Sequence, residues 1–462
     1  MALGDLWPVE RQRLEIHATS LARLASGVDE EVDIAIVGAG AAGLMAAIAA
    51  GRARVDGLRI VTLDGARKLG AKILVAGGGR CNVTHHAVDE SAYAGSSRPA
   101  IRKVLRAFDV ARTLAFFNEL GVELKREETG KLFPTTDDAH TVLEALLGEC
   151  RRLGVELRHP WRVASIERDA DGLTLTPAPQ ADGVALPAIH ARRVILATGG
   201  LALPKSGSDG AGYAFARSLG HSVTPRVLPA LVPLTLADGC FIRELSGLAV
   251  PTSLEVRSGT GKRLMSFTNS TLCTHFGLSG PGPLDVSRYF FDTLHHDAAA
   301  TLRINWLPGQ TLESLDALFA GARQSSPLRV ILDHEFPPPA QRLPERLARA
   351  LCAQAGVEPT SRTDHLSREK RRALAVALAD MTLPVTGTRG FTYAEVTAGG
   401  VPLSELHLDS MASRVCPGLF VIGEICDVDG RIGGFNFQWA WASGHLAGSA
   451  AARVGANEAR NP

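Results

Sequence analysis

The chain has 462 residues, of which 45% are hydrophobic and 21% charged, and its Lys+Arg 49 and Asp+Glu 48 leave a net charge of +1. A chain of this length can bury a large core and is expected to form about two or three domains. A net charge near zero excludes a global field that would steer the protein to nucleic acid or to an anionic membrane. No apolar run approaches the ~18 residues of a membrane span.

The N-terminal residues and the cysteines indicate a cytoplasmic location. Residues 1–30 lack the uninterrupted apolar region of a signal peptide and are expected to form a flexible extension. The number of cysteines is odd, and no C-x-x-C pair occurs. This pattern favours reduced thiols and excludes the usual zinc and iron–sulfur spacings. The His85-His86 pair lacks further ligands at a suitable spacing, so we expect no metal site.

The strongest motif spans residues 33–43, Asp-Ile-Ala-Ile-Val-Gly-Ala-Gly-Ala-Ala-Gly, and continues into the alanine-rich residues 44–50. The apolar run predicts a buried strand and the alanine-rich run a helix. In a dinucleotide-binding turn, Gly38 permits the tight bend, Gly40 lets a pyrophosphate approach the backbone, and Gly43 lets helix and strand pack closely. Free N–H groups at the helix start then face the anion.

The residues that follow support this interpretation. A second apolar strand at residues 58–63 ends in Asp64. A carboxylate about 20 residues after the glycine turn is where an adenosine ribose is bound. We therefore predict a dinucleotide site rather than a purely structural turn.

A second glycine-rich segment, residues 77–79, precedes Arg80, Cys81 and Asn82. Three consecutive glycines are costly to order, so a flexible hairpin tip is one interpretation. The neighbouring side chains favour another, because Lys72 and Arg80 offer cations beside a backbone that can lie against a flat ring or a phosphate. A nearby cation would also lower the pKa of the Cys81 thiol.

The middle of the chain changes character twice. Between residues 100 and 200 we first expect two amphipathic helices around a turn at 127–134, with the second helix at 139–153. Short strands are expected to follow at 155–157 and 161–166. A strand at 193–197 then meets Thr198, Gly199 and Gly200. Short alternating strands with several prolines follow from about residue 225 to 287. Helix-forming sequence at 309–380 contains the one strongly basic run: Arg342, Arg346, Arg349, Arg362, Arg368, Lys370, Arg371 and Arg372. This run is either a solvated helix face or a surface for nucleic acid or an anionic substrate.

The C-terminal segment is expected to return to the first domain. A buried strand at 419–424 ends at Glu424, and Gly433 and Gly434 open a helix at 437–452 that is rich in small residues. Such a helix can approach a sheet closely. Its N-terminus would present N–H groups and a positive dipole end, which suits an anionic group of a bound ligand.

Together these motifs resemble one family. The glycine turn, Gly-Gly-Gly-Arg-Cys-Asn at 77–82, Thr-His-Phe-Gly-Leu-Ser-Gly-Pro at 274–281 and the segment 423–439 occur in the order seen in the BaiN/RdsA family of NAD(P)/FAD-dependent oxidoreductases. The resemblance covers about residues 32–452. It departs from the family pattern at Asp64, where a Glu is usual, at Cys426, where a Leu is usual, and at Ala412, where a Glu is usual.

The resemblance implies an α/β fold with a discontinuous Rossmann-like FAD-binding domain at 31–224 and 388–462, an inserted β-rich domain at 225–308 and a helical subdomain at 309–387. It implies FAD as the cofactor. The cofactor-binding residues that follow from the motifs and the resemblance are Gly38, Gly40, Ala41, Ala42, Gly43, Asp64, Lys72, Gly78, Gly79, Arg80, Cys81, Asn82, Val163, Ala197, Thr198, Gly199, Gly423, Glu424, Asp427, Gly433, Gly434, Phe435 and Asn436.

The resemblance also implies reduction of an activated C=C bond, in uridine of ribosomal RNA or in a small enone. Residues 207–212 have the wrong spacing for a second dinucleotide turn, so NAD(P)H is expected to donate transiently across the flavin. C=C reduction needs a proton donor, for which Cys81 is the first candidate and His275 the second. A flavin-dependent oxidase and a non-catalytic flavoprotein that docks on RNA or a protein partner are the alternatives. The sequence leaves the oligomeric state open.

Overall fold

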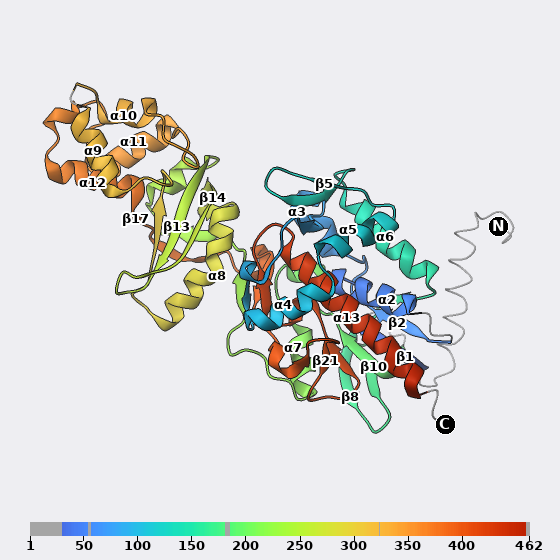
Figure 1. The fold of residues 1–462 in the computed structure, drawn as a ribbon. Coiled ribbons are helices and arrows are strands. Elements are labelled where there is room, and N and C mark those ends of the chain that lie inside the picture. The colour runs from blue at the N-terminus through green and yellow to red at the C-terminus, as the bar shows by residue number, and fades with distance from the viewer. Residues whose placement is uncertain (1–29, 54–56, 181–184, 323, 459–462) are drawn as a thin grey trace. The chain divides into compact units, whose positions relative to one another are not determined.

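The computed structural model describes residues 30–53, 57–180, 185–322 and 324–458 (Figure 1). The chain forms two compact units. The first contains the residues up to 200, residues 205–226 and the residues from 399, and the second contains residues 201–204 and 227–398. The N-terminal extension expected at 1–30 lies outside the described residues, apart from Glu30.

A largely parallel sheet forms the centre of the first unit. Its strands lie in the order β20, β21, β22, β10, β1, β2, β7, and β9 joins β8 to β10. The strands are β1 Glu30–Val37, β2 Ile60–Leu63, β7 Glu156–Arg158, β8 Val163–Arg168, β9 Leu173–Pro177, β10 Ile189–Leu196, β20 Leu406–His407, β21 Ala412–Ser413 and β22 Leu419–Val421. Strands β22, β10, β1, β2 and β7 are parallel neighbours. The continuous apolar character of residues 33–37 follows from burial on both faces of such a sheet.

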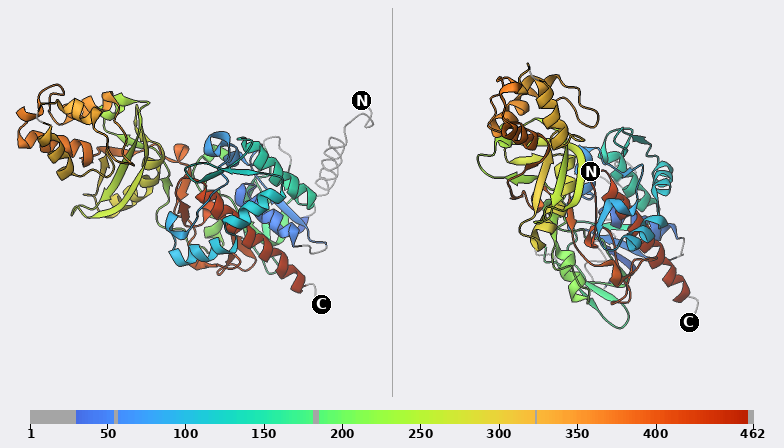
Figure 2. Two further views of the ribbon diagram at one scale, coloured as in Figure 1. Left: turned by 45° about the horizontal axis from the view of Figure 1, so that its top comes forward. Right: turned by 60° about the vertical axis from the view of Figure 1, so that its left-hand side comes forward.

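Helix α2 (Ala41–Arg52) follows β1, and the C-terminal helix α13 (Phe435–Glu458) packs against it (Figures 1 and 2). The two backbones approach very closely. A Cβ on Gly444 would lie 2.6 Å from the carbonyl oxygen of Ala42, and one on Gly448 would lie 2.1 Å from that of Ala46. The small residues of α13 therefore allow this contact, which joins α13 to α2.

Residues 100–158 differ from the expectation of two helices around a turn, because three helices fall within or overlap this range. The whole segment between β2 and β7 contains four helices and two strand pairings: α3 Ala71–Gly79, α4 Arg98–Ala107, α5 Val110–Glu119, α6 Ala139–Arg152, the hairpin of β5 Leu124–Arg126 with β6 Lys131–Pro134, and β3 Thr84–His85 on β6. Asp109 separates α4 from α5, because its side chain accepts a hydrogen bond from Arg112 N (2.9 Å) and caps α5. The turn expected at 127–134 is in part strand β6.

An antiparallel sheet forms the second unit, in the order β17, β16, β13, β14, β15, β12, β18. Its strands are β12 Leu234–Leu236, β13 Ala249–Arg257, β14 Arg263–Thr274, β15 Gly277–Ser279, β16 Thr301–Asn305, β17 Met381–Thr382 and β18 Val385–Thr388. Burial alternates along β13, as expected for a strand with one face on the core.

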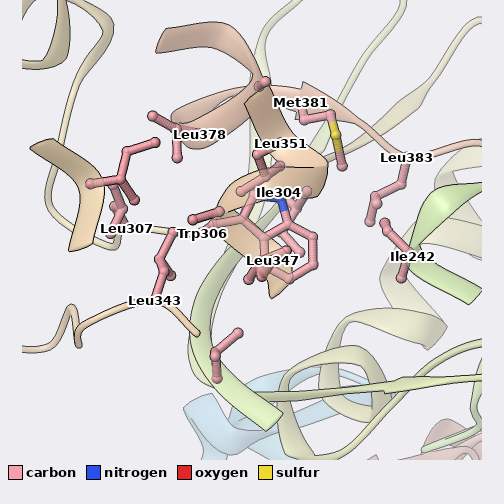
Figure 3. Packing of buried hydrophobic residues seen from close by; sticks show 14 of the residues in the cluster. Ile242, Ile304, Trp306, Leu307, Leu343, Leu347, Leu351, Leu378, Met381 and Leu383 are labelled. Carbon is pink, nitrogen blue, oxygen red and sulfur yellow. The ribbon is translucent and has the colours of Figure 1, made fainter. Parts of the chain in front are cut away.

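Helices cover this sheet and close its core. They are α8 Pro281–His296, α9 Leu312–Gly321, α10 Pro327–Asp333, α11 Glu345–Gln354 and α12 Arg368–Ala379. The fully buried Trp306 lies among Leu347 and Leu351 of α11 and residues from the sheet (Figure 3). The helices and the sheet thus share one hydrophobic core.

The remaining elements are short. They are α7 Ala211–Ser218 and the pairs of β4 Tyr93–Gly95 with β23 Val428–Gly430 and of β11 Leu228–Ala230 with β19 Val396–Ala398. Residues 388–398, which the sequence analysis assigns to the returning FAD-binding domain, belong to the second unit, as do almost all of 225–308 and all of 309–387. Among the described residues, no helix is long and apolar enough to cross a membrane.

Candidate functional site

The three glycines of the β1–α2 turn have different surroundings. A Cβ on Gly38 would lie 2.4 Å from the carbonyl oxygen of Ala197, and one on Gly43 would lie 1.8 Å from that of Gly38, so neither position has room for a side chain. At Gly40, apart from the residue's own chain neighbours, no atom of the described chain lies within 4 Å of the same point. The turn is therefore tightly packed at Gly38 and Gly43 and open at Gly40, which is the shape that an approaching pyrophosphate requires.

The N-terminus of α2 opens onto the same turn. Gly40 is the N-cap and provides no side-chain cap, and the first intrahelical bond is from Leu44 N to Gly40 O (2.9 Å). Ala41 and Ala42 lie in the first turn, ahead of that bond. Their N–H groups are thus unpaired within the helix and can bind an anion.

Asp64, directly after β2, organises this end of the sheet. Its Oδ2 accepts a hydrogen bond from Ala39 N (2.7 Å), and its Oδ1 accepts one from Ala66 N (2.8 Å). Each carboxylate oxygen can accept a second bond. Asp64 therefore holds the glycine turn in place and still has acceptor capacity for a ribose hydroxyl.

The residues predicted after β10 border the same turn. Ala197 N donates to Val37 O (2.9 Å), which extends the β1–β10 pairing. A Cβ on Gly199 would lie 2.4 Å from Ser208 Oγ, and one on Gly212 would lie 1.9 Å from Thr198 Oγ1. Val163 is buried in β8, and the segment before it is tied to Asp64 by the bond from Trp161 N to Asp64 O (2.7 Å).

Lys72 and Glu424, which are far apart in the sequence, form an ion pair. Lys72 Nζ of α3 lies 2.5 Å from Glu424 Oε2, and both side chains are mostly buried. Gly423, beside Glu424, donates from its N–H to Ser443 Oγ of α13 (3.1 Å). The two predicted residues therefore join α3 to the end of β22, and the charge of Lys72 is balanced within the protein.

The glycine-rich segment ends α3 in a left-handed conformation. Gly77, Gly78 and Gly79 have φ values of 59°, 71° and 86°, and no described atom lies within 4 Å of a Cβ built on Gly78. This backbone would be strained for other residues. The segment is exposed, so its backbone is available to a ligand.

Arg80 turns away from Cys81. Its Nη1 lies 2.7 Å from Glu127 Oε1 and 3.5 Å from Asp137 Oδ1, and its guanidinium stacks over the ring of Phe133, 4.0 Å from the centroid. The cation is thus held by the β5–β6 hairpin and its flanking residues. It supplies little charge to the Cys81 thiol.

Cys81 is sealed inside the first unit. Its exposed fraction is 0%, and burial raises the pKa of its thiol to about 12. The expectation that Arg80 lowers this pKa is wrong, because loss of solvation outweighs a cation that is already paired with carboxylates. Cys81 is a neutral thiol at physiological pH.

Asn82 joins the glycine-rich segment to the start of α13. With its amide oriented to satisfy both partners, it accepts a hydrogen bond from Gly434 N (3.1 Å) and donates to Thr84 O (3.0 Å). A Cβ on Gly434 would lie 2.5 Å from the carbonyl carbon of Thr84. Gly433 precedes this contact with a φ of 125°.

The other C-terminal residues mainly fix the backbone. The Asn436 amide accepts from Gly430 N (2.8 Å) and donates to Gly430 O (3.0 Å). The Phe435 ring stacks on His85, with 4.9 Å between centroids. A Cβ on Gly95 would lie 2.4 Å from Asp427 O, so the predicted residue Asp427 packs against the last residue of β4.

Two residues of α13 that the sequence analysis missed secure this arrangement. The buried Gln438 accepts from Thr84 Oγ1 (2.7 Å) and Thr113 Oγ1 (3.0 Å) through Oε1, and its Nε2 donates to Phe108 O (2.8 Å). Trp441 Nε1 donates to Val83 O (2.9 Å). A lone glutamine between aromatic residues at the start of a helix was the available signal.

His275 belongs to the second unit, at the turn between β14 and β15, and is exposed. The structure therefore brings together the predicted residues of the first unit, around the glycine turn and around the α3–α13 contact. The second candidate proton donor lies in the other unit.

Comparison with known proteins agrees with this architecture. The model of the HI0933-like protein Rossmann domain matches residues 32–450. The chain is 36% identical to a 3-dehydro-bile acid delta(4,6)-reductase of Clostridium scindens over 91% of this chain and 98% of that protein. It is 34% identical to a ribosomal RNA dihydrouridine synthase of Escherichia coli over 90% of this chain and 96% of that protein.

The chain belongs to the HI0933-like family. The resemblance to the BaiN/RdsA oxidoreductases and the α/β Rossmann-like fold are thereby confirmed, and the protein is an FAD-dependent oxidoreductase of this family. Among solved structures, an E. coli quinol fumarate reductase aligns with a TM-score of 0.50 at 16% identity, over 93% of this chain and 72% of that one. At that identity the likeness concerns the fold alone.

Proposed function

We propose that the protein reduces an activated C=C bond, with FAD as its cofactor and NAD(P)H as its electron donor. The names of two relatives that match nearly the whole chain support the reaction, because each describes saturation of a carbon–carbon double bond. The open space above Gly40, beside the uncapped start of α2, is the single observation that supports a dinucleotide cofactor in this chain.

The residues of the first unit fit FAD. The glycine turn and the first-turn N–H groups of α2 would hold the pyrophosphate, and Asp64 would accept from the ribose. The exposed segment at Gly78 and Gly79 and the start of α13 would position the ring system. Bound FAD would supply the hydride-transfer chemistry.

The proton donor is better assigned to His275 than to Cys81. A general acid must come within hydrogen-bond distance of the carbon that it protonates. Cys81 has no exposed surface, so it would have to move to reach a substrate, and we assign it a packing role. His275 is exposed, and imidazole is the side chain used most often for proton transfer.

Two substrate classes follow from the relatives: uridine in ribosomal RNA and a small enone. For an RNA substrate we propose that Arg368 and Arg372, on one face of α12, contact phosphates. The six other cations of the basic run already have partners: Arg342 with Asp333, Arg349 with Glu345, Arg362 with Asp364, Arg371 with Asp316, Arg346 with Glu244 O and Lys370 with Gly356 O.

All seven cysteines are free, which supports a reducing cytoplasm as the location of the protein.

Anaerobic stopped-flow tests the proposal. NADPH or NADH should reduce the flavin rapidly, air should reoxidise it slowly, and an enone or uridine-containing ribosomal RNA should reoxidise it quickly. Fast reoxidation by air alone would indicate an oxidase. No reoxidation by either substrate class would indicate a non-catalytic flavoprotein. Mass spectrometry of ribosomal RNA from a deletion strain, with lost dihydrouridine as the readout, separates the two substrate classes.

A further inference from the structure

Two segments of the second unit that are far apart in the sequence meet at Arg389. The Arg389 guanidinium carbon lies 3.4 Å from the ring centroid of Tyr393 and 4.5 Å from that of Phe276. The His275 ring meets Phe276 edge to face, with 5.1 Å between centroids. We call His275, Phe276, Arg389 and Tyr393 the Arg389 cluster.

Backbone contacts fix the Arg389 side of the cluster. Arg389 directly follows β18, and its N–H donates to Pro233 O (3.1 Å). Gly390 N donates to Thr388 Oγ1 (3.1 Å), and Tyr393 N donates to Gly390 O (3.1 Å) in a single 3-10 turn, Phe391–Tyr393. Arg389 and Tyr393 are thus presented by a short closed loop.

The His275 side is fixed equally well. The Thr274 hydroxyl donates to Gly277 O (3.0 Å) and accepts from Gly277 N (3.1 Å), which closes the β14–β15 turn. A Cβ on Gly277 would lie 2.3 Å from Leu234 O, so the turn sits tightly on β12. Arg243 Nε donates to His275 O (2.9 Å). His275 and Phe276 therefore occupy a defined position on the sheet.

The polar groups of the cluster are left without protein partners. Within the residues that the structure describes, the Arg389 guanidinium, the Tyr393 hydroxyl and the His275 ring nitrogens make no hydrogen bond or ion pair. Arg349 and Arg362 of the same unit instead pair with carboxylates. Tyr393 is 48% exposed, so the cluster can be reached from solvent.

An arginine stacked on aromatic rings is prepared to bind a planar or tetrahedral oxyanion. Stacking restricts the guanidinium, so less entropy is lost when its N–H fork binds. Guanidinium–carboxylate and guanidinium–phosphate pairs are charge-assisted and often bidentate. The Tyr393 hydroxyl adds a further donor beside it.

We propose that the Arg389 cluster binds an oxyanion of the substrate, a carboxylate or a phosphate, and thereby orients it. The inference rests on the proposed C=C reduction and adds a requirement, namely that the substrate carries a negative charge. RNA meets this requirement through its phosphodiesters, and a small enone meets it only if it carries a carboxylate, as a bile acid does.

The test uses the full-length holoenzyme, with Arg389→Gln as the variant and Arg389→Lys as the conservative one. Arg263→Gln is the matched control, because Arg263 is an exposed arginine of the same unit whose nearest carboxylate, Glu255, is 3.5 Å away. The probes are an α,β-unsaturated keto bile acid, its methyl ester, and a short uridine-rich RNA oligonucleotide. Dissociation constants are measured at several salt concentrations.

Arg389→Gln should weaken binding of the acid about 10- to 100-fold and leave the ester unchanged, as expected for loss of a hydrogen bond to a charged group. If the anion comes from RNA, Arg389→Gln should instead weaken binding of the oligonucleotide, and the magnitude of the slope of log affinity against log salt concentration should decrease by about one. Arg389→Lys should retain part of the affinity, and Arg263→Gln all of it.

Unchanged affinity in Arg389→Gln, an equal loss for acid and ester, or failure of the wild type to bind either charged probe would overturn the oxyanion site. These outcomes leave the proposed reduction separately testable. Flavin reduction by NAD(P)H and reoxidation by the neutral methyl ester need no oxyanion contact. Absence of flavin reduction, or absence of reoxidation by both the ester and uridine-containing RNA, would contradict the reductase itself.

Discussion

At the residue scale, the open point above Gly40 makes the cofactor site testable with one substitution. Gly40→Val places a branched side chain where the pyrophosphate would lie, while no described atom within 4 Å is displaced. FAD occupancy should therefore collapse with the fold retained. The measurement is the flavin-to-protein absorbance ratio together with circular dichroism.

Gly148→Val in α6 is the control for Gly40→Val. A Cβ at Gly148 also meets no described atom within 4 Å, but this position is remote from any predicted cofactor contact. Its flavin content should equal that of the wild type. Full FAD occupancy in Gly40→Val would remove the β1–α2 turn from the cofactor site.

The two candidate acids should behave differently on substitution. His275→Gln should slow reoxidation by the C=C substrate about 10²–10⁴-fold, the usual contribution of a positioned general acid, and leave flavin reduction by NAD(P)H nearly unchanged. Cys81→Ala should slow neither half-reaction selectively, because the thiol is sealed from solvent. Stopped-flow traces of both half-reactions decide which of the two residues is the proton donor. A selective slowing of reoxidation in Cys81→Ala would restore Cys81 as the donor.

The buried thiols should also make stability depend on alkaline pH. Burial raises the pKa values of Cys81, Cys150 and Cys273 to about 12, whereas an unfolded thiol titrates near about 8.5. The stabilisation is therefore fully present below about pH 8.5 and is lost as pH rises toward about 12. Urea midpoints between about pH 8 and pH 10 should fall less steeply in Cys81→Ala than in the wild type. Parallel slopes would contradict the assignment.

At the scale of elements, Gln438 of α13 links the segment after the glycine-rich turn to α5. Gln438→Leu would leave the Thr84 hydroxyl and the Phe108 carbonyl without their partner in the interior, whereas the Thr113 hydroxyl would keep its bond to Asp109 O (3.0 Å). Each unsatisfied group costs about 1–3 kcal/mol, so both stability and FAD affinity should fall. Urea unfolding of the apoprotein and flavin titration measure the two effects.

The exposed Gln354 at the end of α11 provides the matched control for Gln438. Gln354→Leu should leave the urea midpoint and the flavin affinity close to those of the wild type. If Gln438→Leu is equally harmless, the link between α13 and α5 carries little energy.

The predictability of these elements follows the range of the interactions that form them. The β1–α2 turn could be predicted because strand, glycines and helix are contiguous and Gly43 packs against Gly38 within the turn, although the contact of Gly38 with Ala197 after β10 is long-range. The division of α4 from α5 depends on a local cap at Asp109 and was within reach of the sequence. The role of Gln438 was not, since its partners come from three other segments and a single polar residue in an apolar helix does not name them.

Side-chain partnership was the least predictable property. Arg80 lies next to Cys81 in the chain, yet it pairs with Glu127 across a hairpin whose strands are only three and four residues long. Strands this short carry almost no periodic signal. The sign of the pKa shift at Cys81 was therefore wrong, because it depended on burial and on that pairing.

At the scale of the whole molecule, the second unit is inserted between two neighbouring points of the first. A Cβ on Gly399 would lie 2.3 Å from Arg226 O. Thr224 N donates to Gly400 O (2.9 Å), and Gly400 N donates to Thr224 Oγ1 (2.9 Å). Apart from residues 201–204, which also belong to the second unit, the chain leaves the first unit at 226 and re-enters it at 399. The predicted cofactor residues all belong to that first unit.

A deletion can therefore separate cofactor binding from substrate turnover. Replacing residues 227–398 with a short Gly/Ser linker joins ends that are already adjacent, so loop closure adds little entropy cost. The first unit keeps its own parallel sheet and the α2–α13 contact, and it should fold and bind FAD. It lacks His275 and the Arg389 cluster, so it should not reduce an enone or RNA uridine. Flavin absorbance after reconstitution, compared with the full-length chain carrying Gly40→Val, measures binding. A folded deletion variant that reduces substrate at the wild-type rate would show that the second unit contributes neither acid nor substrate contact.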